Sequence, residues 1–292
     1  MIINTSDKKF FQKKSLINYN GSLYDLSIPR VMGILNVTPD SFYDGGRYSH
    51  VGQAVERVGQ MLNEGADIID VGACSTRPGA AVPDAGDELN RLLPVIAEIK
   101  RQYPDAILSV DTFRASVVDA LVGKFGCLIV NDISSGGIDS EMFRTVASLN
   151  VPYILMHMRG TPETMQNNTS YKNVTKEVVK ELSANLDKLY SLGLNDVIID
   201  PGFGFAKTID QNYELFKHLD AFRFFEIPLL VGVSRKSMLY KFLGGTPADA
   251  LNATTVLNTL ALQAGANILR VHDVKPAVEA VAIVHKLKEF AQ

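Results

Sequence analysis

The sequence predicts an α/β fold, a single (β/α)8 TIM barrel, from two features of its hydrophobic pattern. Eight short apolar runs each end on a polar or charged residue, or once on glycine, at 31–36, 67–72, 106–111, 127–132, 152–157, 196–200, 228–236 and 267–273. An amphipathic stretch follows nearly every run, and strands that alternate with helices in one compact domain imply a parallel sheet. Eight such units are the number that closes a barrel.

The ends of these runs predict where a site forms. All strand ends of such a barrel open onto one face, so residues that are far apart in the sequence converge there. The residues at or near the run ends are Asn36, Asp111, Asn131, Asp200, Lys236, Arg270 and His272.

The length of 292 residues predicts one domain with an extension, because barrels of this type commonly need about 250 residues. We assign residues 1–30 to an N-terminal extension and residues 31–292 to the barrel. A short strand pair between Leu16 and Ile28 could cover the bottom of the barrel.

The first two units follow from helical spacing. After a strand at 31–36, apolar residues recur at helical spacing between Val51 and Leu62, and Gly65 ends the helix. A second helix is expected near 87–102, where Pro94 removes a backbone donor and should kink it.

The later units repeat this order. Strands are expected at 106–110, 128–131, 152–156, 197–200, 228–233 and 267–271. Helices are expected at 114–124, from about 140, at about 172–192, after Asp210, after the seventh strand, and from Val274 to near Phe290.

The composition excludes several classes of protein. With 46% hydrophobic residues, 21% charged residues and a net charge of −3, the chain lacks the basic footprint of a nucleic-acid or anionic-lipid binder. The N-terminus has no apolar core of a signal peptide, and no stretch approaches 18 unbroken apolar residues. Cys74 and Cys127 are too few for a disulfide framework, so we expect a protein of the reducing cytoplasm.

Two connections that follow strands are longer than barrels prefer, and both lie on the expected active face. The first, 36–50, contains Asn36, Thr38 and Asp40, and the second, 73–88, contains Ser75, Thr76, Arg77 and Gly79. Long connections on this face usually carry chemistry.

Seven motifs together resemble dihydropteroate synthase. They are LNVTPDSF at 35–42, STRPGA at 75–80, SVDT at 109–112, MHMRGTPETMQ at 156–166, DPGFGFAKT at 200–208, GVSRKS at 232–237 and RVHDV at 270–274. They occur in order over about residues 30–275, so the resemblance makes 31–292 a pterin-binding barrel. It implies that a hydroxymethyl-dihydropterin pyrophosphate is joined to 4-aminobenzoate, with release of pyrophosphate, in folate synthesis.

The departing pyrophosphate needs cations and hydrogen-bond donors, which Arg77, Arg270 and His272 could supply. The resemblance adds Asn36 and Thr76 to this pyrophosphate site. It also makes Asn36 a ligand of Mg²⁺, and an uncharged oxygen suits an ion that is bound mainly by substrate phosphates and water.

A pterin ring presents a guanidine-like edge that one carboxylate can bind, and Asp200 is our choice for it. The resemblance places Asp111, Asn131 and Lys236 around the rest of the ring. If bond cleavage precedes attack by the amine, a cation develops on the pterin methylene carbon, and Asp111 would stabilise it. The predicted catalytic residues are Asp111, Lys236, Arg270 and His272.

The aminobenzoate site follows mainly from the resemblance. It is expected to contain Thr76, Arg77, Pro78, Phe205, Ser234 and Lys236. Sulfonamides imitate aminobenzoate, so these residues would also decide drug sensitivity. The 202–208 loop has no obvious insertion, so we expect a sensitive enzyme, with a drug-resistant synthase as an alternative.

Some of these residues have simpler interpretations. Asp111 or Asn131 could cap the following helix, and the His272–Asp273 pair could be a capped loop. His157 has no second His or Cys at ligand spacing, which favours a supporting or packing role over metal binding. Cys74 stands where the family usually has glutamate, so the second long loop departs from the family pattern at this position.

Two other functions remain open. A pterin-dependent methyltransferase uses a similar barrel but has no need of the STRPG and RVHDV motifs. A non-catalytic pterin-binding protein would have lost the phosphate-binding residues, which this chain retains. The apolar stretch 250–265 and the resemblance both suggest a homodimer.

Overall fold

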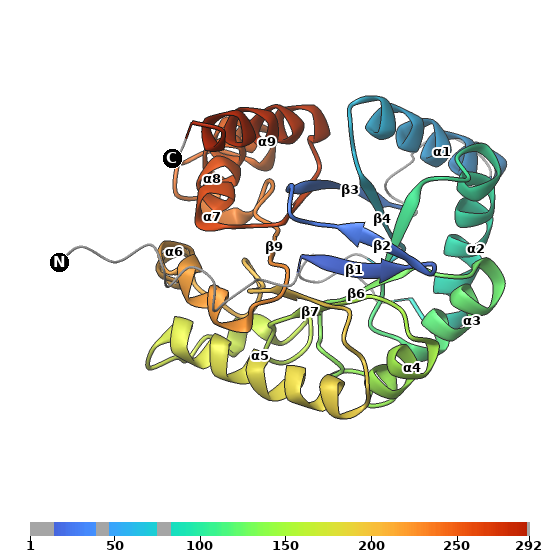
Figure 1. Ribbon diagram of the computed structural model, residues 1–292, viewed down its shortest axis with the longest axis horizontal. Coiled ribbons are helices and arrows are strands. Elements are labelled where there is room, and N and C mark those ends of the chain that lie inside the picture. The colour runs from blue at the N-terminus through green and yellow to red at the C-terminus, as the bar shows by residue number, and fades with distance from the viewer. Residues whose placement is uncertain (1–14, 39–46, 75–82, 291–292) are drawn as a thin grey trace.

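Eight parallel strands wrap into a nearly closed barrel with helices between them, which confirms the predicted fold class (Figure 1). This computed structural model describes residues 15–38, 47–74 and 83–290. The strand order is β8-β7-β6-β5-β4-β3-β10-β9, so neighbours in the sheet are also neighbours in the sequence except where β3 meets β10. Such an order is that of a barrel in which each strand is followed by its own helix.

The strands and helices of the described residues follow the predicted order, and their bounds differ most at β9 and at the start of α2. The barrel strands are β3 (Arg30–Asn36), β4 (Ile68–Gly72), β5 (Ile107–Asp111), β6 (Ile129–Asp132), β7 (Tyr153–Met156), β8 (Val197–Asp200), β9 (Leu230–Val231) and β10 (Ile268–Val271). The α-helices are α1 (Arg47–Asn63), α2 (Ala85–Gln102), α3 (Ala115–Phe125), α4 (Met142–Leu149), α5 (Val174–Ser191), α6 (Ile209–Lys217), α7 (Ser237–Tyr240), α8 (Leu251–Ala264) and α9 (Val274–Lys288). Short 3₁₀ helices are η3 (Met165–Asn167), η4 (Leu219–Phe225) and η5 (Pro247–Ala250).

The seventh barrel strand is much shorter than the predicted 228–233. Pro228 has no N–H to donate, and the N–H of Leu229 bonds to the side chain of Asn267 at 3.0 Å instead of to a neighbouring strand. Only an isolated bridge between Ile199 and Leu229 joins this edge to β8. Regular strand pairing therefore begins at Leu230, and it ends at Val231.

Helix α2 begins earlier than predicted, because Asp84 caps it. The Asp84 carboxylate accepts the backbone N–H of Asp87 at 2.8 Å, and acidic residues in the first turn favour the positive end of the helix dipole. The helix continues through Pro94 to Gln102.

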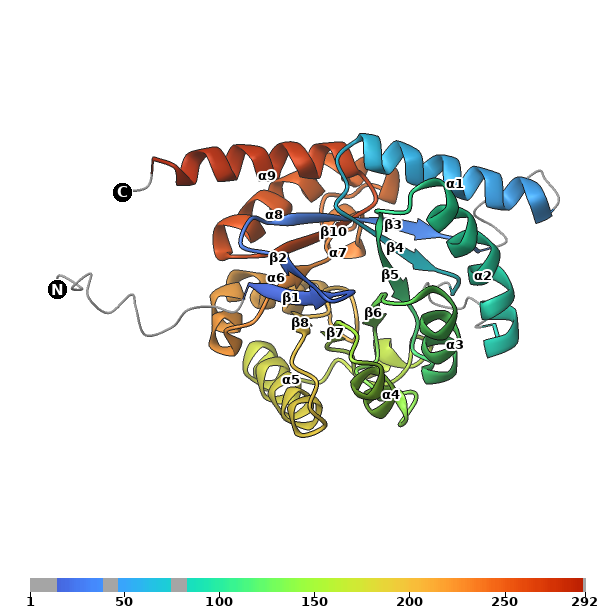
Figure 2. The same cartoon turned by 45° about the vertical axis from the view of Figure 1, so that its right-hand side comes forward.

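A two-stranded antiparallel sheet, β1 (Leu16–Tyr19) and β2 (Ser22–Asp25), precedes the barrel. In Figure 1 it crosses the middle of the ring of strands, and Figure 2 shows it lying against their near ends. Ile17 and Leu26 from this segment pack into one apolar cluster with a residue from each barrel strand: Met32, Ile68, Ile107, Ile129, Ile154, Ile198, Leu230 and Ile268. The segment therefore closes one end of the barrel.

This apolar layer fixes which side chains point into the barrel above it. Successive side chains of a strand alternate between the two faces, so a residue two positions later points inward as well. Two residues after members of the layer come Asp70, Asn131, Asp200 and Arg270. The barrel interior is therefore apolar at the closed end and charged towards the carboxyl ends of the strands.

In the ranges that the structure describes, no helix combines the length and the apolar character needed to cross a membrane.

Candidate functional site

Arg270 lies inside the barrel between two carboxylates. Its Nε donates to Oδ2 of Asp70 at 2.7 Å, and its Nη2 donates to Oδ2 of Asp111 at 2.6 Å. Burial lowers the pKa of Arg270, but Asp70 and Asp111 raise it more, so the guanidinium is charged. A guanidinium has five N–H donors, so this arrangement leaves donors for another partner.

Asp70 is a site residue that sequence reasoning missed. It is fully buried, and its Oδ2 also accepts a hydrogen bond from Nδ2 of Asn131 at 2.9 Å. Its other oxygen, Oδ1, is buried without a hydrogen-bond partner. The available signal was a carboxylate inside the apolar run 67–72, two residues after the inward-facing Ile68.

Asp111 ends β5 and faces Arg270. A Cβ on the neighbouring Gly72 would lie 3.1 Å from the Cβ of Asp111, so glycine leaves space for this side chain. Burial raises the pKa of Asp111 to about 7, against the opposing effect of Arg270. The capping interpretation is wrong, because Arg114 and Glu141 are the N-cap residues of α3 and α4.

Asp200 and Lys236 lie close enough to influence each other's charge. Asp200 is buried, and its Oδ1 accepts the backbone N–H of Gly202 at 2.8 Å. Burial raises the pKa of Asp200, and the positive charge of Lys236 opposes part of this rise. Burial also lowers the pKa of Lys236 to about 8, although the negative charge of Asp200 opposes this effect.

Lys236 also contacts the loop between β8 and α6. Its Nζ donates to the carbonyl of Phe203 and lies 4.5 Å from the ring centre of Phe205, a cation–π contact. Phe205 belongs to an apolar cluster whose other buried members are Phe113, Ile133, Met156, Met165 and Ala206. The sequence pattern did not predict this cluster, which gives the strand-end face an apolar wall that suits a flat ring.

Ser234 and His272 are hydrogen-bonded to each other. The hydroxyl oxygen of Ser234 accepts the backbone N–H of His272 at 3.1 Å and lies 3.1 Å from its ring Nδ1. The hydroxyl hydrogen is then available for Nδ1, so we assign the ring hydrogen of neutral His272 to Nε2. Burial, reinforced by Arg270, lowers the pKa of His272 to about 4.

Asp273 does not pair with His272. Its carboxylate accepts hydrogen bonds from Nε and Nη2 of Arg235 at 2.8 and 2.7 Å. The Asp273 side chain makes no capping hydrogen bond to α9. The interpretation of His272–Asp273 as a capped loop pair is therefore wrong.

Asn36 ends β3 with an exposed side chain. Within 15–38, 47–74 and 83–290, no group of three or more His, Cys, Asp or Glu side chains could hold a metal ion. A single amide oxygen suits an ion that is held mainly by phosphate oxygens and water rather than by the protein. The donors present therefore fit the predicted Mg²⁺ in that role.

Thr76, Arg77 and Pro78 lie outside the described residues. The residues that flank them are held by Arg114, which bonds to the buried Glu88 and to the carbonyl of Pro83. Arg114 also lies 3.8 Å from the sulfur of Cys74. Burial raises the pKa of Cys74 to about 12, so the residue is an uncharged thiol.

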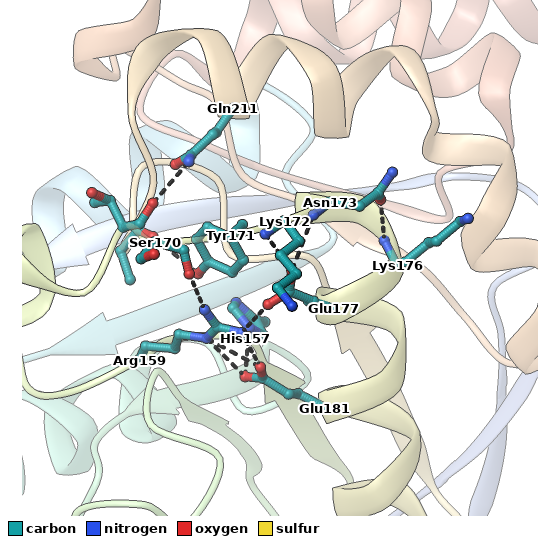
Figure 3. A network of polar contacts seen from close by, with 12 residues as sticks. His157, Arg159, Ser170, Tyr171, Lys172, Asn173, Lys176, Glu177, Glu181 and Gln211 are labelled. Atoms are coloured by element: carbon teal, nitrogen blue, oxygen red, sulfur yellow. Dashed lines mark hydrogen bonds and ion pairs between the residues drawn. The ribbon is translucent and has the colours of Figure 1, made fainter.

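His157 is part of a polar network beside the site, as Figure 3 shows. Its Nε2 lies 3.0 Å from Glu181 of α5, and its Nδ1 lies 3.0 Å from Nζ of Lys207. Arg159 donates its Nε to the same glutamate at 3.1 Å and covers the ring of Tyr171 at 4.0 Å. These contacts agree with the predicted supporting role.

A surface groove of about 470 Å³ lies between α5 and η4. Thr175, Lys180 and Phe224 are among its lining residues, and none of the lining residues comes from a strand end. The groove is therefore separate from the site inside the barrel.

The chain is similar in sequence to proteins of known activity. A family model described as "Pterin binding enzyme" matches residues 32–272. The dihydropteroate synthase of Escherichia coli (strain K12) is 42% identical over 266 residues, which cover 90% of this chain and 93% of that protein.

Two solved structures have the same fold. A Yersinia pestis dihydropteroate synthase in a sulfonamide drug complex has a TM-score of 0.87 and 39% identity, and the match covers 94% of this chain and 99% of that one. A Xanthomonas albilineans dihydropteroate synthase with 4-aminobenzoic acid has a TM-score of 0.86 and 36% identity, and the match covers 94% and 98% of the two chains.

Proposed function

The chain belongs to the pterin-binding enzyme family as a dihydropteroate synthase, and we propose that the charged residues inside its barrel carry out this reaction. The reaction transfers the dihydropterin methylene group from pyrophosphate to the amine of 4-aminobenzoate. Arg270, held between Asp70 and Asp111 with donors to spare, is the observation that supports this assignment of the site most directly.

We propose that the pterin ring lies against Asp200. One carboxylate can accept both N–H groups of the guanidine-like edge of the ring. Asn131, Asp111 and Lys236 then provide donors and acceptors to its other edges. Phe113, Ile133 and Met156 would cover a face of the ring.

The pyrophosphate would bind to the unused donors of Arg270 and to the Nε2–H of His272. As the bond between the methylene carbon and the pyrophosphate oxygen breaks, both bonding electrons leave with the oxygen. Fixed donors stabilise this charge without having to reorganise. A carboxylate at Asp111 would stabilise the positive charge that develops on the carbon.

The amine of 4-aminobenzoate then forms the new carbon–nitrogen bond with its lone pair and loses a proton to solvent. An aryl amine is neutral at physiological pH, so a strong general base is unnecessary. Phe205 and Lys236 would hold its ring and carboxylate. The sulfonamide complex of the Y. pestis relative supports competition of sulfonamides for the same place.

We also propose that Mg²⁺ assists the reaction, with Asn36 as its protein ligand. When bound, the ion neutralises charge on the pyrophosphate. The exposed Asn36 can reach such an ion without a carboxylate cage. Omission of Mg²⁺ and Asn36→Ala should each lower pyrophosphate release, and equal activity with and without the ion would exclude this role.

We propose a homodimer through α8 and α9, which pack side by side (Figure 1). Val256 and Leu260 of α8, and Ile283 and Leu287 of α9, are 45–61% exposed and spaced four residues apart on each helix. Exposed apolar residues on two helices that pack together support an interface more than single scattered ones would. A second copy of the chain would cover it.

Light scattering at micromolar concentration tests this dimer. The expected mass is twice the 32.0 kDa of the chain, and Leu260→Glu combined with Ile283→Glu should halve it. Leu192→Glu, a change at a similarly exposed leucine after α5, should leave the dimer intact. A wild-type monomer would contradict the proposal.

A cytoplasmic location is part of the proposal. Cys74 and Cys127 are both free thiols, as expected for a reducing compartment.

The experiment that tests the function uses dihydropterin pyrophosphate, Mg²⁺ and 4-aminobenzoate with the wild type and with Arg270→Ala. Dihydropteroate formation by the wild type and its near loss in the variant would support the proposed site. Methyl transfer from methyltetrahydrofolate to a corrinoid protein, without dihydropteroate, would favour the methyltransferase alternative.

A further inference from the structure

Lys207 is a buried lysine with all of its hydrogen bonds satisfied inside the protein. It lies at the end of the loop between β8 and α6, and 4% of the residue is exposed. Its Nζ lies 3.0 Å from Nδ1 of His157 and donates to the carbonyls of Gly202 at 2.9 Å and Phe205 at 3.0 Å. Burial lowers the pKa of Lys207 to about 7, against the opposing effect of Asp200. The ammonium form has three N–H donors, so none remains for a substrate.

The loop that Lys207 holds forms one wall of the site. Gly202, Gly204 and Ala206 all have positive φ, at 71°, 82° and 49°, so the chain turns tightly there and points two carbonyls at Lys207. The loop presents Phe205 to Lys236. Without Lys207, the Gly202 carbonyl would keep the backbone N–H of Phe205 at 3.2 Å. Both buried carbonyls would nevertheless lose the Lys207 donor, which is costly.

His157 orients the ammonium group from the other side. Burial lowers the pKa of His157 to about 4, so the ring is neutral at physiological pH. A neutral ring that accepts the Lys207 bond at Nδ1 carries its hydrogen on Nε2, where it donates to Glu181 at 3.0 Å. Figure 3 shows His157 and Arg159 converging on this glutamate. The chain of contacts ties the loop to α5.

We propose that Lys207 is a positioning residue for the aminobenzoate side of the site. Its ammonium, oriented by His157, fixes the carbonyls of Gly202 and Phe205 and thereby holds the Phe205 ring against Lys236. The inference rests on the proposed function, because it takes Phe205 as a wall of the aminobenzoate site. Lys207 takes no part in bond making or breaking.

Lys207→Met tests the proposal because it keeps the length of the side chain and removes its donors. The KM for 4-aminobenzoate should rise about tenfold or more, while the KM for the pterin pyrophosphate changes less than about threefold. Lys176→Met, at an exposed lysine of α5, is the matched control and should behave as the wild type.

A pair of His157 variants tests the same contact should Lys207→Met fold poorly. Asn at 157 can place an amide oxygen near the position of Nδ1 and keep the Lys207 bond, whereas Leu cannot. His157→Asn should therefore retain a KM for 4-aminobenzoate within about threefold of the wild type, and His157→Leu should resemble Lys207→Met. Equal values for the two His157 variants would overturn the proposal.

Hydrogen exchange of the peptide that contains residues 201–208 provides a readout without turnover. His157→Leu should increase its exchange relative to the wild type, and His157→Asn should not. Unchanged exchange in His157→Leu would overturn the proposal whatever the activity. A wild type that forms no dihydropteroate would instead contradict the proposed function, so the two failures can be distinguished.

Discussion

At the scale of single residues, Asp70 organises the site from below. One of its oxygens accepts from both Arg270 and Asn131, at 2.7 and 2.9 Å. Because these two side chains come from strands on different sides of the barrel, a single carboxylate sets their positions relative to each other. We therefore place Asp70 among the residues that position the pyrophosphate and pterin groups.

Asp70→Asn should lower kcat/KM for the pterin pyrophosphate by roughly 10- to 100-fold, because the buried Arg270 loses one of its two charged partners. Steady-state kinetics measures this. Asp67→Asn is the matched control, since Asp67 forms a partly exposed ion pair with Arg30 outside the site. It should change kcat/KM less than about threefold, and similar losses in both variants would contradict the account.

The strand-end rule could predict Asp111, Asp200 and Arg270 from the sequence, because each closes or nearly closes an apolar run. The rule could not predict that Arg270 binds Asp111, since that contact depends on how the closed barrel brings β10 and β5 together. Nor could it find Asp70, which lies within a run and not at its end. The alternation of side chains would have found it once the inward face was known.

At the scale of elements, the loop between β8 and α6 shows how backbone conformation shapes the site. A Cβ on Gly202 would lie 1.9 Å from the carbonyl oxygen of His157, and the φ of this glycine is +71°. Only glycine therefore allows the loop to approach the end of β7. The motif at 200–208 was recognised in the sequence, but this close approach was not predictable without the fold.

Gly202→Ala should destabilise the protein by roughly 3 kcal/mol or more, because the added methyl meets backbone that cannot move aside. Gly193→Ala is the matched control, since Gly193 also has a positive φ but nothing lies within 4 Å of an added Cβ. It should cost only about 1 kcal/mol. Urea unfolding measures both values, and equal losses would contradict the role of the close approach.

The elements differ in how well the sequence predicted them. The strand at 197–200 was predicted with both bounds correct, because the residues on either side of its four apolar and acidic residues clearly mark its ends. The start of β9 was not, because the side chain of Asn267, from another unit of the barrel, takes the backbone N–H of Leu229. The local sequence pattern does not predict contacts between residues that are far apart in the chain.

At the scale of the whole molecule, the barrel keeps two neutral histidines beside its charged interior. Burial lowers the pKa of both His157 and His272 to about 4. A group whose pKa is lowered in the folded state binds fewer protons there than in the unfolded state. The neutral histidines therefore favour folding above about pH 6.5, and this contribution is lost as the pH falls towards 4.

His157→Asn should remove the part of this pH dependence that belongs to His157. Between pH 7 and pH 4.5, the free energy of unfolding of the wild type should fall by roughly 2 kcal/mol more than that of the variant. Urea titrations at the two pH values measure the difference. Parallel losses in the wild type and the variant would show that His157 is not held neutral by the fold.

The central claim for the molecule is that side chains from opposite sides of the barrel form one site for one coupled transfer. The most direct test measures pyrophosphate and dihydropteroate in the same reaction of the wild type with dihydropterin pyrophosphate, Mg²⁺ and 4-aminobenzoate. We predict one pyrophosphate for each dihydropteroate formed, and loss of both products together in Arg270→Ala. Dihydropteroate formation that survives Arg270→Ala at the wild-type rate would contradict the account.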